Sequence, residues 1–126
     1  MSPKRLKPTE AELAILRVLW TRGPSTVREV QEALKRDTGY TTVLKLMQIM
    51  TDKELVRRDE SQRTHVYHAR VTEEQTQRQL VADLLDRAFG GSALKLVMQA
   101  ISSSHATPEE LAEIRRLLDR HRGGSR

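Results

Sequence analysis

The sequence predicts a mainly α-helical protein with one small β-hairpin, in which a winged helix-turn-helix domain precedes a helical dimerisation domain. Three helix-sized segments with apolar residues at helical spacing come first, and two short β-type runs follow them directly. This order of elements is that of a winged helix-turn-helix, whose third helix enters the major groove of DNA. After residue 71 only helical patterns remain, so we expect domains 1–71 and 72–126.

The first two helices have recognisable beginnings and ends. Thr9 and Glu12 form the pattern of a capping box, which predicts a helix start at this point. Gly23, followed by a proline, ends this helix because glycine accepts a left-handed stop and proline cannot continue a helix. Ser25 is then expected to cap a second, shorter helix, which a break at residues 37–39 ends.

The third helix is predicted over residues 41–53. Four apolar residues at i, i+3, i+4 and i+7 share one face of it: Val43, Leu46, Met47 and Met50. The opposite, polar face carries Thr41, Lys45, Gln48 and Asp52. A merely solvated outer face is the default interpretation of an isolated helix. Here the helix follows a helix-turn-helix pattern and precedes a hairpin, so we expect its outer face to contact DNA.

The hairpin is predicted from runs at residues 55–59 and 64–69, joined by a four-residue turn of type I. Its arginines lie where a wing would meet phosphate. The complete set of predicted DNA contacts is Arg28, Tyr40, Thr41, Thr42, Lys45, Gln48, Arg57, Arg58 and Arg63. Gln48 suits a bidentate contact with adenine and Lys45 suits guanine, whereas the arginines would set affinity more than sequence preference.

The positive charge of the chain is unevenly placed. Residues 1–71 contain 14 Lys and Arg against 9 Asp and Glu, while residues 72–126 contain 8 of each, so the whole net charge of +5 lies in the first part. A charge of this size is ordinary for solubility. Its confinement to the half with the helix-turn-helix pattern favours a polyphosphate partner.

Several classes of protein are excluded by what the sequence lacks. With no cysteine there is no disulfide, no thiolate catalysis and no cysteine-ligated zinc, which fits a cytoplasmic location. No apolar run approaches the roughly 18 residues of a membrane span, and no signal peptide pattern is present. The four histidines are not spaced as ligands of one metal, and no catalytic motif occurs. We therefore expect no enzyme, no metal, no cofactor and no membrane insertion.

Three helices are predicted in the second domain. They begin at Thr72, Ser92 and Thr107, and a loop is expected over residues 102–105. Their apolar stripes are too large for a small appendage and predict burial in a homodimer, the alternative being that they pack back on the first domain. The predicted dimerisation residues are Leu80, Leu84, Leu85, Leu94, Val97, Leu111, Ile114 and Leu118.

Three segments carry a family resemblance: Leu6-Lys-Pro-Thr-Glu-Ala-Glu-Leu-Ala-Ile-Leu-Arg-Val-Leu-Trp20, Gly23-Pro-Ser-Thr-Val-Arg-Glu-Val30 and Gly39-Tyr-Thr-Thr-Val43. They resemble the penicillinase-repressor family, and the resemblance spans nearly the whole chain. It implies a homodimeric winged-helix repressor that binds double-stranded DNA at a palindromic operator and dimerises through its C-terminal helices. It also implies a membrane-bound sensor metallopeptidase as a partner, which in the better-known members triggers cleavage of the repressor.

The sequence departs from the family pattern in three places. Glu54 stands where the family usually has a glycine after the third helix, so the turn must form without one or the helix end is rearranged. The cysteine cluster of the copper-responsive branch is missing. The Asn-Phe peptide that is cut in the β-lactam branch is not evident in residues 93–101.

Two other functions are compatible with the same fold. One is a protein-interaction module without operator binding. The third helix discriminates weakly against it, since Lys45 and Gln48 favour DNA whereas Asp52 does not. The other is a regulator that senses a small molecule between its domains. Aromatic residues make up only 3% of the chain, which argues against an aromatic-lined pocket.

Overall fold

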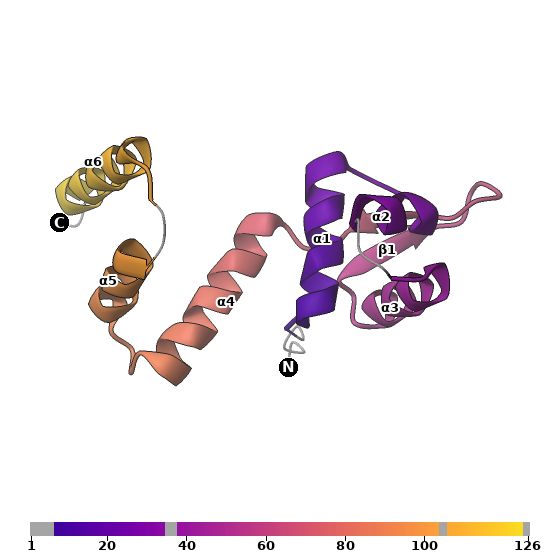
Figure 1. Ribbon diagram of the computed structural model, residues 1–126, viewed down its shortest axis with the longest axis horizontal. Coiled ribbons are helices and arrows are strands. Elements are labelled where there is room, and N and C mark those ends of the chain that lie inside the picture. Colours follow the sequence, from indigo (N-terminus) through magenta and orange to yellow (C-terminus); the bar gives the residue numbers. More distant parts are fainter. Residues whose placement is uncertain (1–6, 35–37, 104–105, 125–126) are drawn as a thin grey trace. The chain divides into compact units, whose positions relative to one another are not determined.

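The computed structural model describes residues 7–34, 38–103 and 106–124, and it confirms a mostly helical fold with one antiparallel hairpin (Figure 1). In chain order the elements are α1 (Glu10–Arg22), α2 (Val27–Leu34), α3 (Tyr40–Asp52), β1 (Val56–Asp59), β2 (Val66–Ala69), α4 (Glu73–Ala88), α5 (Ala93–Ser103) and α6 (Pro108–Gly124). They form two compact units that divide between Val81 and Ala82, within α4. Compactness alone does not show where a domain folds independently, so domains 1–71 and 72–126 stay a prediction.

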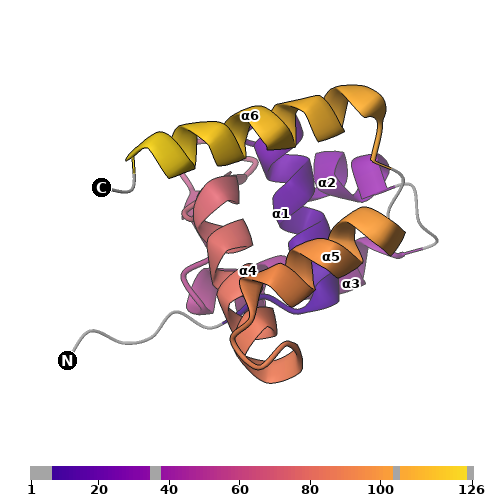
Figure 2. The same ribbon diagram turned by 90° about the vertical axis from the view of Figure 1, so that its left-hand side faces the viewer.

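The first unit has a core built from α1, α2, α3 and the hairpin. The three helices pack against one another, and α1 and α3 also contact the strands (Figures 1 and 2). The fully buried side chains come from every one of these elements and include Ile15, Leu16, Val30, Val43, Met47, Met50, Val56 and Tyr67. The predicted stripe of α3 is therefore its inner face, with Leu46 partly buried beside it.

The beginning of α1 agrees with the prediction, whereas that of α2 corrects it. The Thr9 hydroxyl accepts the Glu12 N–H at 3.2 Å, and the Glu12 carboxylate accepts the Thr9 N–H at 2.9 Å. At α2 the same reciprocal bonds join Thr26 and Glu29, so the cap is Thr26 and the prediction of Ser25 was wrong. The reason is that a capping box needs Glu three residues after the cap, and only Thr26 satisfies that spacing.

Ser25 has a different task in the fold. Its backbone N–H donates to the Tyr67 carbonyl at 3.1 Å, and its own carbonyl accepts from the Tyr67 N–H at 2.8 Å. The Ser25 hydroxyl donates to the Gly23 carbonyl at 2.8 Å. Ser25 thus joins the connection between α1 and α2 to strand β2, and it is almost completely buried there.

The hairpin has a longer connection than the sequence predicted. Asp59 pairs with Val66, so six residues, 60–65, join the strands, and the predicted four-residue turn was wrong. The Asp59 carboxylate accepts the backbone N–H of Ser61 at 2.9 Å, which turns the chain immediately after β1. This hydrogen bond, with that of the Ser61 side chain, lowers the pKa of Asp59 from its usual range.

A Schellman motif ends α3. The Leu55 N–H donates to the Met50 carbonyl at 2.9 Å, and the Glu54 N–H donates to the Thr51 carbonyl at 3.1 Å. This motif places Glu54 at the left-handed position, with φ of +63°. The turn therefore keeps the geometry that favours glycine, and a residue with a side chain is held in a conformation costing about 1–2 kcal/mol.

Two side-chain contacts fix α1 within the first unit. The Lys53 ammonium lies 2.7 Å from the carboxylate of Glu12, whose side chain is 3% exposed, and this ion pair joins the start of α1 to the end of α3. The Trp20 indole N–H donates to the Val71 carbonyl at 2.9 Å, and this bond joins α1 to the chain that follows the hairpin. Because Glu12 also caps α1, one carboxylate links the local helix start to the tertiary fold.

Helices α4, α5 and α6 start at the residues that the sequence predicts. Thr72 with Gln75 and Thr107 with Glu110 form reciprocal capping bonds, and the Ser92 hydroxyl accepts the Lys95 N–H at 3.1 Å. Helix α5 extends to Ser103, so the predicted loop start at residue 102 was wrong. The loop's last two residues, 104–105, lie outside the described residues. The hydroxyls of Ser102 and Ser103 bond back to carbonyls one turn earlier, a pattern compatible with continued helix.

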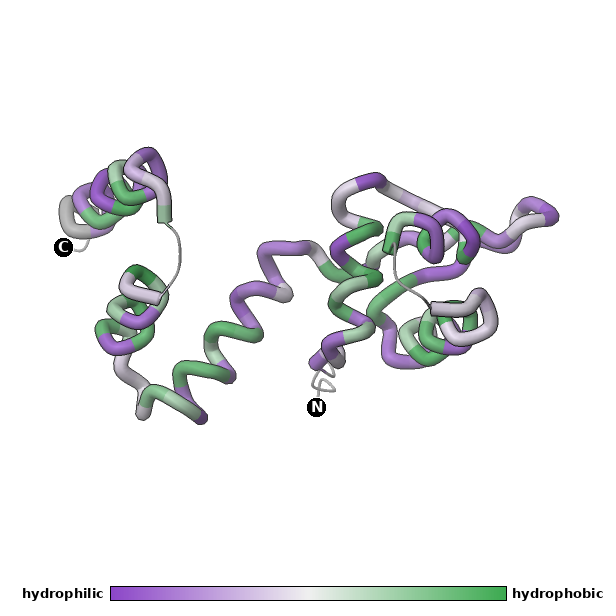
Figure 3. The backbone as a smooth tube through the Cα atoms, viewed as in Figure 1, coloured by the Kyte–Doolittle hydropathy of each residue, from purple (hydrophilic) through white to green (hydrophobic). Residues whose placement is uncertain are grey.

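Large apolar side chains remain exposed along the last three helices. Figure 3 shows the hydrophobic residues of α4 in its second half and further hydrophobic turns in α5 and α6. Among the described side chains after Thr76, none is buried. Of the predicted dimerisation residues, Leu84, Leu94, Val97, Leu111 and Leu118 are exposed, while Leu80, Leu85 and Ile114 are partly buried. In the described part of the chain no helix is both long enough and apolar enough to cross a membrane.

Relieving the left-handed residue should stabilise the first unit. We expect Glu54→Gly to raise the free energy of unfolding by about 1 kcal/mol, because glycine adopts this backbone conformation freely. Urea denaturation followed by circular dichroism measures the effect. Asp52→Gly is the matched control: it also removes one carboxylate but places glycine in the helix, and it should destabilise by about 1 kcal/mol. Equal effects of the two substitutions would contradict the assignment of strain to Glu54.

Removing the partner of the buried carboxylate should destabilise the same unit. We expect Lys53→Ala to lower the free energy of unfolding by about 2–3 kcal/mol, since Glu12 would keep a buried charge without its ion pair. Arg78→Ala, which breaks the exposed pair with Glu74, should change it by less than about 0.5 kcal/mol. If both substitutions have the same small effect, the Glu12–Lys53 contact does not hold the helices together.

Candidate nucleic-acid interface

The structure places five of the predicted contact residues on one exposed surface of α3. Packing of Val43, Met47 and Met50 into the core turns the other side of the helix to solvent. The exposed residues are Tyr40, Thr41, Thr42, Lys45 and Gln48. No side chain caps the first turn of α3, since its N-cap residue is Gly39. This end of the helix therefore presents backbone N–H groups, hydroxyls and an ammonium group together, which suits contact with phosphates and base edges.

Arg28 on α2 is positioned by the first residue of α3. Its guanidinium carbon lies 5.4 Å from the centre of the Tyr40 ring, within the range of a cation–π contact. Both side chains are exposed. The contact joins the two helices of the helix-turn-helix at their solvent side and restricts the directions in which Arg28 can point.

The three predicted arginines of the hairpin do not have equal freedom. The Arg58 guanidinium lies 2.6 Å from the Glu60 carboxylate. Hydrogen bonds with Tyr67 and then with Glu60 raise the pKa of Arg58. Arg57 on β1 and Arg63 in the turn are exposed, and no ion pair is found for either of them in the described structure. Arg57 and Arg63 are therefore the better candidates for phosphate contacts.

A concave surface lies between α2, α3 and the hairpin turn. We call it the wing groove; it encloses about 520 Å³ and is lined by Thr26, Val27, Arg28, Tyr40, Leu44, Arg63, Thr64, His65 and Tyr67. It brings three predicted residues, Arg28, Tyr40 and Arg63, to one place. Sequence reasoning missed Thr26, Thr64 and His65 as lining residues, because their proximity depends on how the turn approaches the helices. The position of His65 two residues after Arg63 in the predicted wing was the one available signal.

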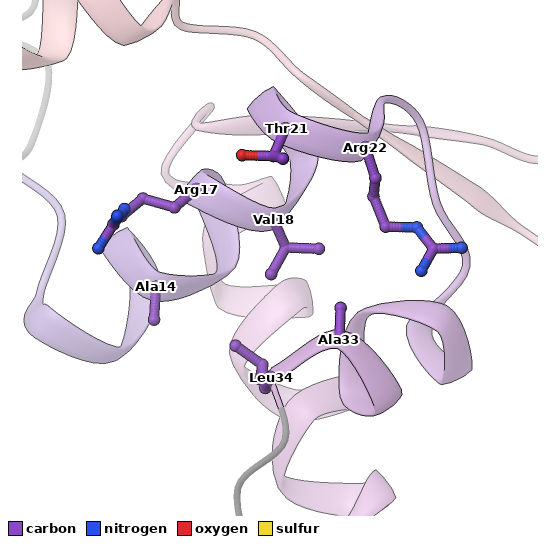
Figure 4. Close-up of a pocket in the computed structure, with 7 residues that line it drawn as sticks. All are labelled: Ala14, Arg17, Val18, Thr21, Arg22, Ala33 and Leu34. Carbon is purple, nitrogen blue, oxygen red and sulfur yellow. The ribbon is translucent and has the colours of Figure 1, made fainter.

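A second pocket, between α1 and α2, involves none of the predicted DNA contacts. It encloses about 360 Å³, and Figure 4 shows Arg17 and Arg22 at its two ends with Val18 and Leu34 between them. Arg22 is paired with Glu29 across a distance of 3.8 Å, and both side chains are about half exposed. The pocket therefore has an apolar floor with a guanidinium at each end, and among the described residues an ion pair is found for Arg22 but not for Arg17.

The described residues contain no group of three or more His, Asp or Glu side chains that could hold a metal ion. His68 lies on β2 and His65 in the turn before it. The predicted contact residues of this site carry cationic, hydroxyl, phenol and amide side chains.

Comparison with known proteins identifies the family. The penicillinase repressor family matches residues 8–120. The transcriptional regulator BlaI of Mycobacterium tuberculosis, in strains CDC 1551 / Oshkosh and H37Rv, is 43% identical over 61 residues, which are 46% of this chain and 44% of the relative. The chain thus spans less than half the length of those relatives. A penicillinase repressor of Staphylococcus aureus is 19% identical over 121 residues, covering 94% of this chain and 96% of the relative. Because the family match extends over nearly all of the sequence, the chain belongs to the penicillinase repressor family.

Proposed function

We propose that the protein is a transcriptional repressor that binds a palindromic operator as a homodimer, with α3 in the major groove. The observation that carries the proposal is the exposed polar face of α3, which lies opposite the buried apolar face of the same helix and is followed in the chain by a hairpin with a net positive charge. The names of the relatives support a role in transcription. Membership of a repressor family also bears out the expectation that the chain is not an enzyme.

Sequence preference would come from the middle of α3. Lys45 and Gln48 are exposed on successive turns of this helix, and their side chains suit guanine and adenine respectively. Thr41 and Thr42, in the first turn, would contact phosphate or base edges. Arg28, Arg57 and Arg63 would contact the backbone and contribute affinity without sequence information.

The homodimer is proposed from the state of α5 and α6. No described side chain of either helix is buried, and Leu94 and Leu118 are 68% and 62% exposed. Such surfaces are unfavourable in water unless another surface covers them. A second copy of the same helices would cover them, and two-fold symmetry would then present two α3 helices to two half-sites.

The site of action and a further partner follow from the same proposal. A repressor must meet chromosomal DNA, so we place it in the cytoplasm. The family resemblance supports a membrane-bound sensor metallopeptidase as a further partner, and because the Asn-Phe peptide of the β-lactam branch is not evident in residues 93–101, cleavage at such a peptide is not part of the proposal.

DNA binding should depend on Lys45. We expect footprinting on the DNA upstream of the protein's own gene to show a two-fold symmetric site, with affinity falling steeply as salt rises. Lys45→Ala should weaken binding to that site by about 1–3 kcal/mol, because the ammonium group would no longer reach a base.

Lys95→Ala, which removes an exposed lysine of α5, is the matched control and should leave this affinity unchanged. Equal affinities of the wild type and Lys45→Ala would remove Lys45 from the interface. Weak binding without a protected site, here and elsewhere in the genome, would contradict operator recognition.

Self-association should depend on the exposed apolar residues of α5. We expect the wild type to sediment as a dimer at micromolar concentration and Leu94→Glu to shift it towards monomer, since burial of the new charge is unfavourable. Gln99→Glu introduces the same charge at a polar position of α5 and should leave the dimer intact. A wild-type monomer would refute the homodimer.

A further inference from the structure

In the wing groove, three separate elements bring cationic side chains together. Arg28 comes from α2, Tyr40 and Leu44 come from α3, and Arg63 and His65 come from the hairpin turn. None of the nine described lining residues carries a carboxylate. The groove is therefore suited to an anion on composition alone.

Three carboxylates in the segments that adjoin the groove have partners of their own. Glu29 of α2 accepts the Thr26 N–H at 2.9 Å and pairs with Arg22. In the hairpin, Glu60 is paired with Arg58, and Asp59 accepts the Ser61 N–H. The charged or titratable groups that face His65 across the groove are thus Arg28, Arg63, Tyr40 and Tyr67, and none of them neutralises a cation.

Arg28 is oriented before any ligand arrives. Its contact with the Tyr40 ring, at 5.4 Å, holds the guanidinium at the wall of the groove. A planar guanidinium donates two parallel hydrogen bonds to a phosphate, and restricting its motion lowers the entropic cost of forming them. The groove therefore has a prepared donor, Arg28, on one side and Arg63 and His65 of the hairpin turn on the other.

The position of the groove selects the kind of anion. If α3 lies in the major groove and the wing reaches the adjacent minor groove, one sugar–phosphate strand must pass between them, because that strand separates the two grooves of a duplex. The surface between α3 and the wing is the wing groove. A phosphodiester of the bound DNA is thus the anion that the geometry brings there.

We propose that the wing groove binds one backbone phosphodiester of DNA and that His65 contributes to it as the protonated imidazolium, so that DNA binding takes up a proton. The inference rests on the proposed function and adds His65 to its contacts. Imidazole gains its proton close to neutral pH, and an adjacent phosphate favours the charged form. Affinity should therefore rise as the pH falls and level off once the free protein is itself protonated.

The test measures the affinity of the full chain for a mixed-sequence DNA duplex long enough for one homodimer, at about pH 8 and about pH 6. A backbone contact does not require the operator, so the outcome is independent of sequence recognition. We expect the wild type to bind more tightly at the lower pH, by a factor of about ten for each of the two wings of the dimer. His65→Gln should lose most of this difference and should match the wild type at the higher pH.

His68→Gln is the matched control, because His68 lies in the same hairpin but does not line the wing groove. It should keep the pH dependence of the wild type. The salt dependence of binding provides a second measurement. Compared with the wild type, binding of His65→Gln should release about one fewer counterion from the DNA for each wing at the lower pH, and the same number at the higher pH.

An unchanged pH dependence in His65→Gln would overturn the inference and leave the repressor proposal intact. The inference would also fail if His65→Gln and His68→Gln lost the pH dependence equally, because the effect would then belong to the hairpin as a whole. Failure of the wild type to bind any duplex at either pH would overturn both proposals. Circular dichroism of both variants establishes that each is folded.

Discussion

The carboxylate of Glu12 connects two parts of the first unit that lie far apart in the sequence. It accepts the backbone N–H of Thr9, the N-cap residue of α1, and it pairs with Lys53 at the end of α3. A buried charge is tolerated only when it is paired and hydrogen-bonded, so both contacts have to form together. The position of α3, and with it the direction of its outer face, is thereby tied to α1.

Two further links complete the frame around α3. The backbone of Ser25 pairs with Tyr67 and fixes the hairpin against the connection between α1 and α2. The Trp20 indole reaches the Val71 carbonyl, where the chain leaves the hairpin. None of these links uses an exposed residue on the outer face of α3.

Much of this fold could be predicted from local patterns. Capping residues, apolar spacing and the Gly23 stop located the helices of the first unit, because these signals act within a few residues of the chain. At the start of α2 the adjacent residues Ser25 and Thr26 both have a hydroxyl that suits an N-cap. Only the position of Glu29, three residues after Thr26, favours Thr26. The connection between the strands is longer than the predicted four-residue type I turn. The hydrogen bond between Asp59 and Ser61 forms within this connection, and the prediction did not include it.

The candidate site was only partly accessible to sequence reasoning, for a different reason. The exposed residues of α3 follow from its helical period once the inner face is known. The wing groove does not, since Thr26 and His65 are brought together by the packing of the hairpin against two helices. For α5 and α6 the apolar pattern predicted the helices themselves. It could not predict the surface that covers their exposed apolar side chains, because in the proposed dimer that surface belongs to a second copy of the chain.

The left-handed backbone at Glu54 bears on how the protein can change. The codons for glutamate and glycine differ at a single nucleotide, so the unstrained residue is one mutational step away. The core around Val43, Met47 and Met50 must already supply the free energy that this conformation costs. A single mutational step, Glu54→Gly, would therefore stabilise the first unit. This gain can offset a substitution elsewhere in the unit that lowers the free energy of unfolding by a similar amount.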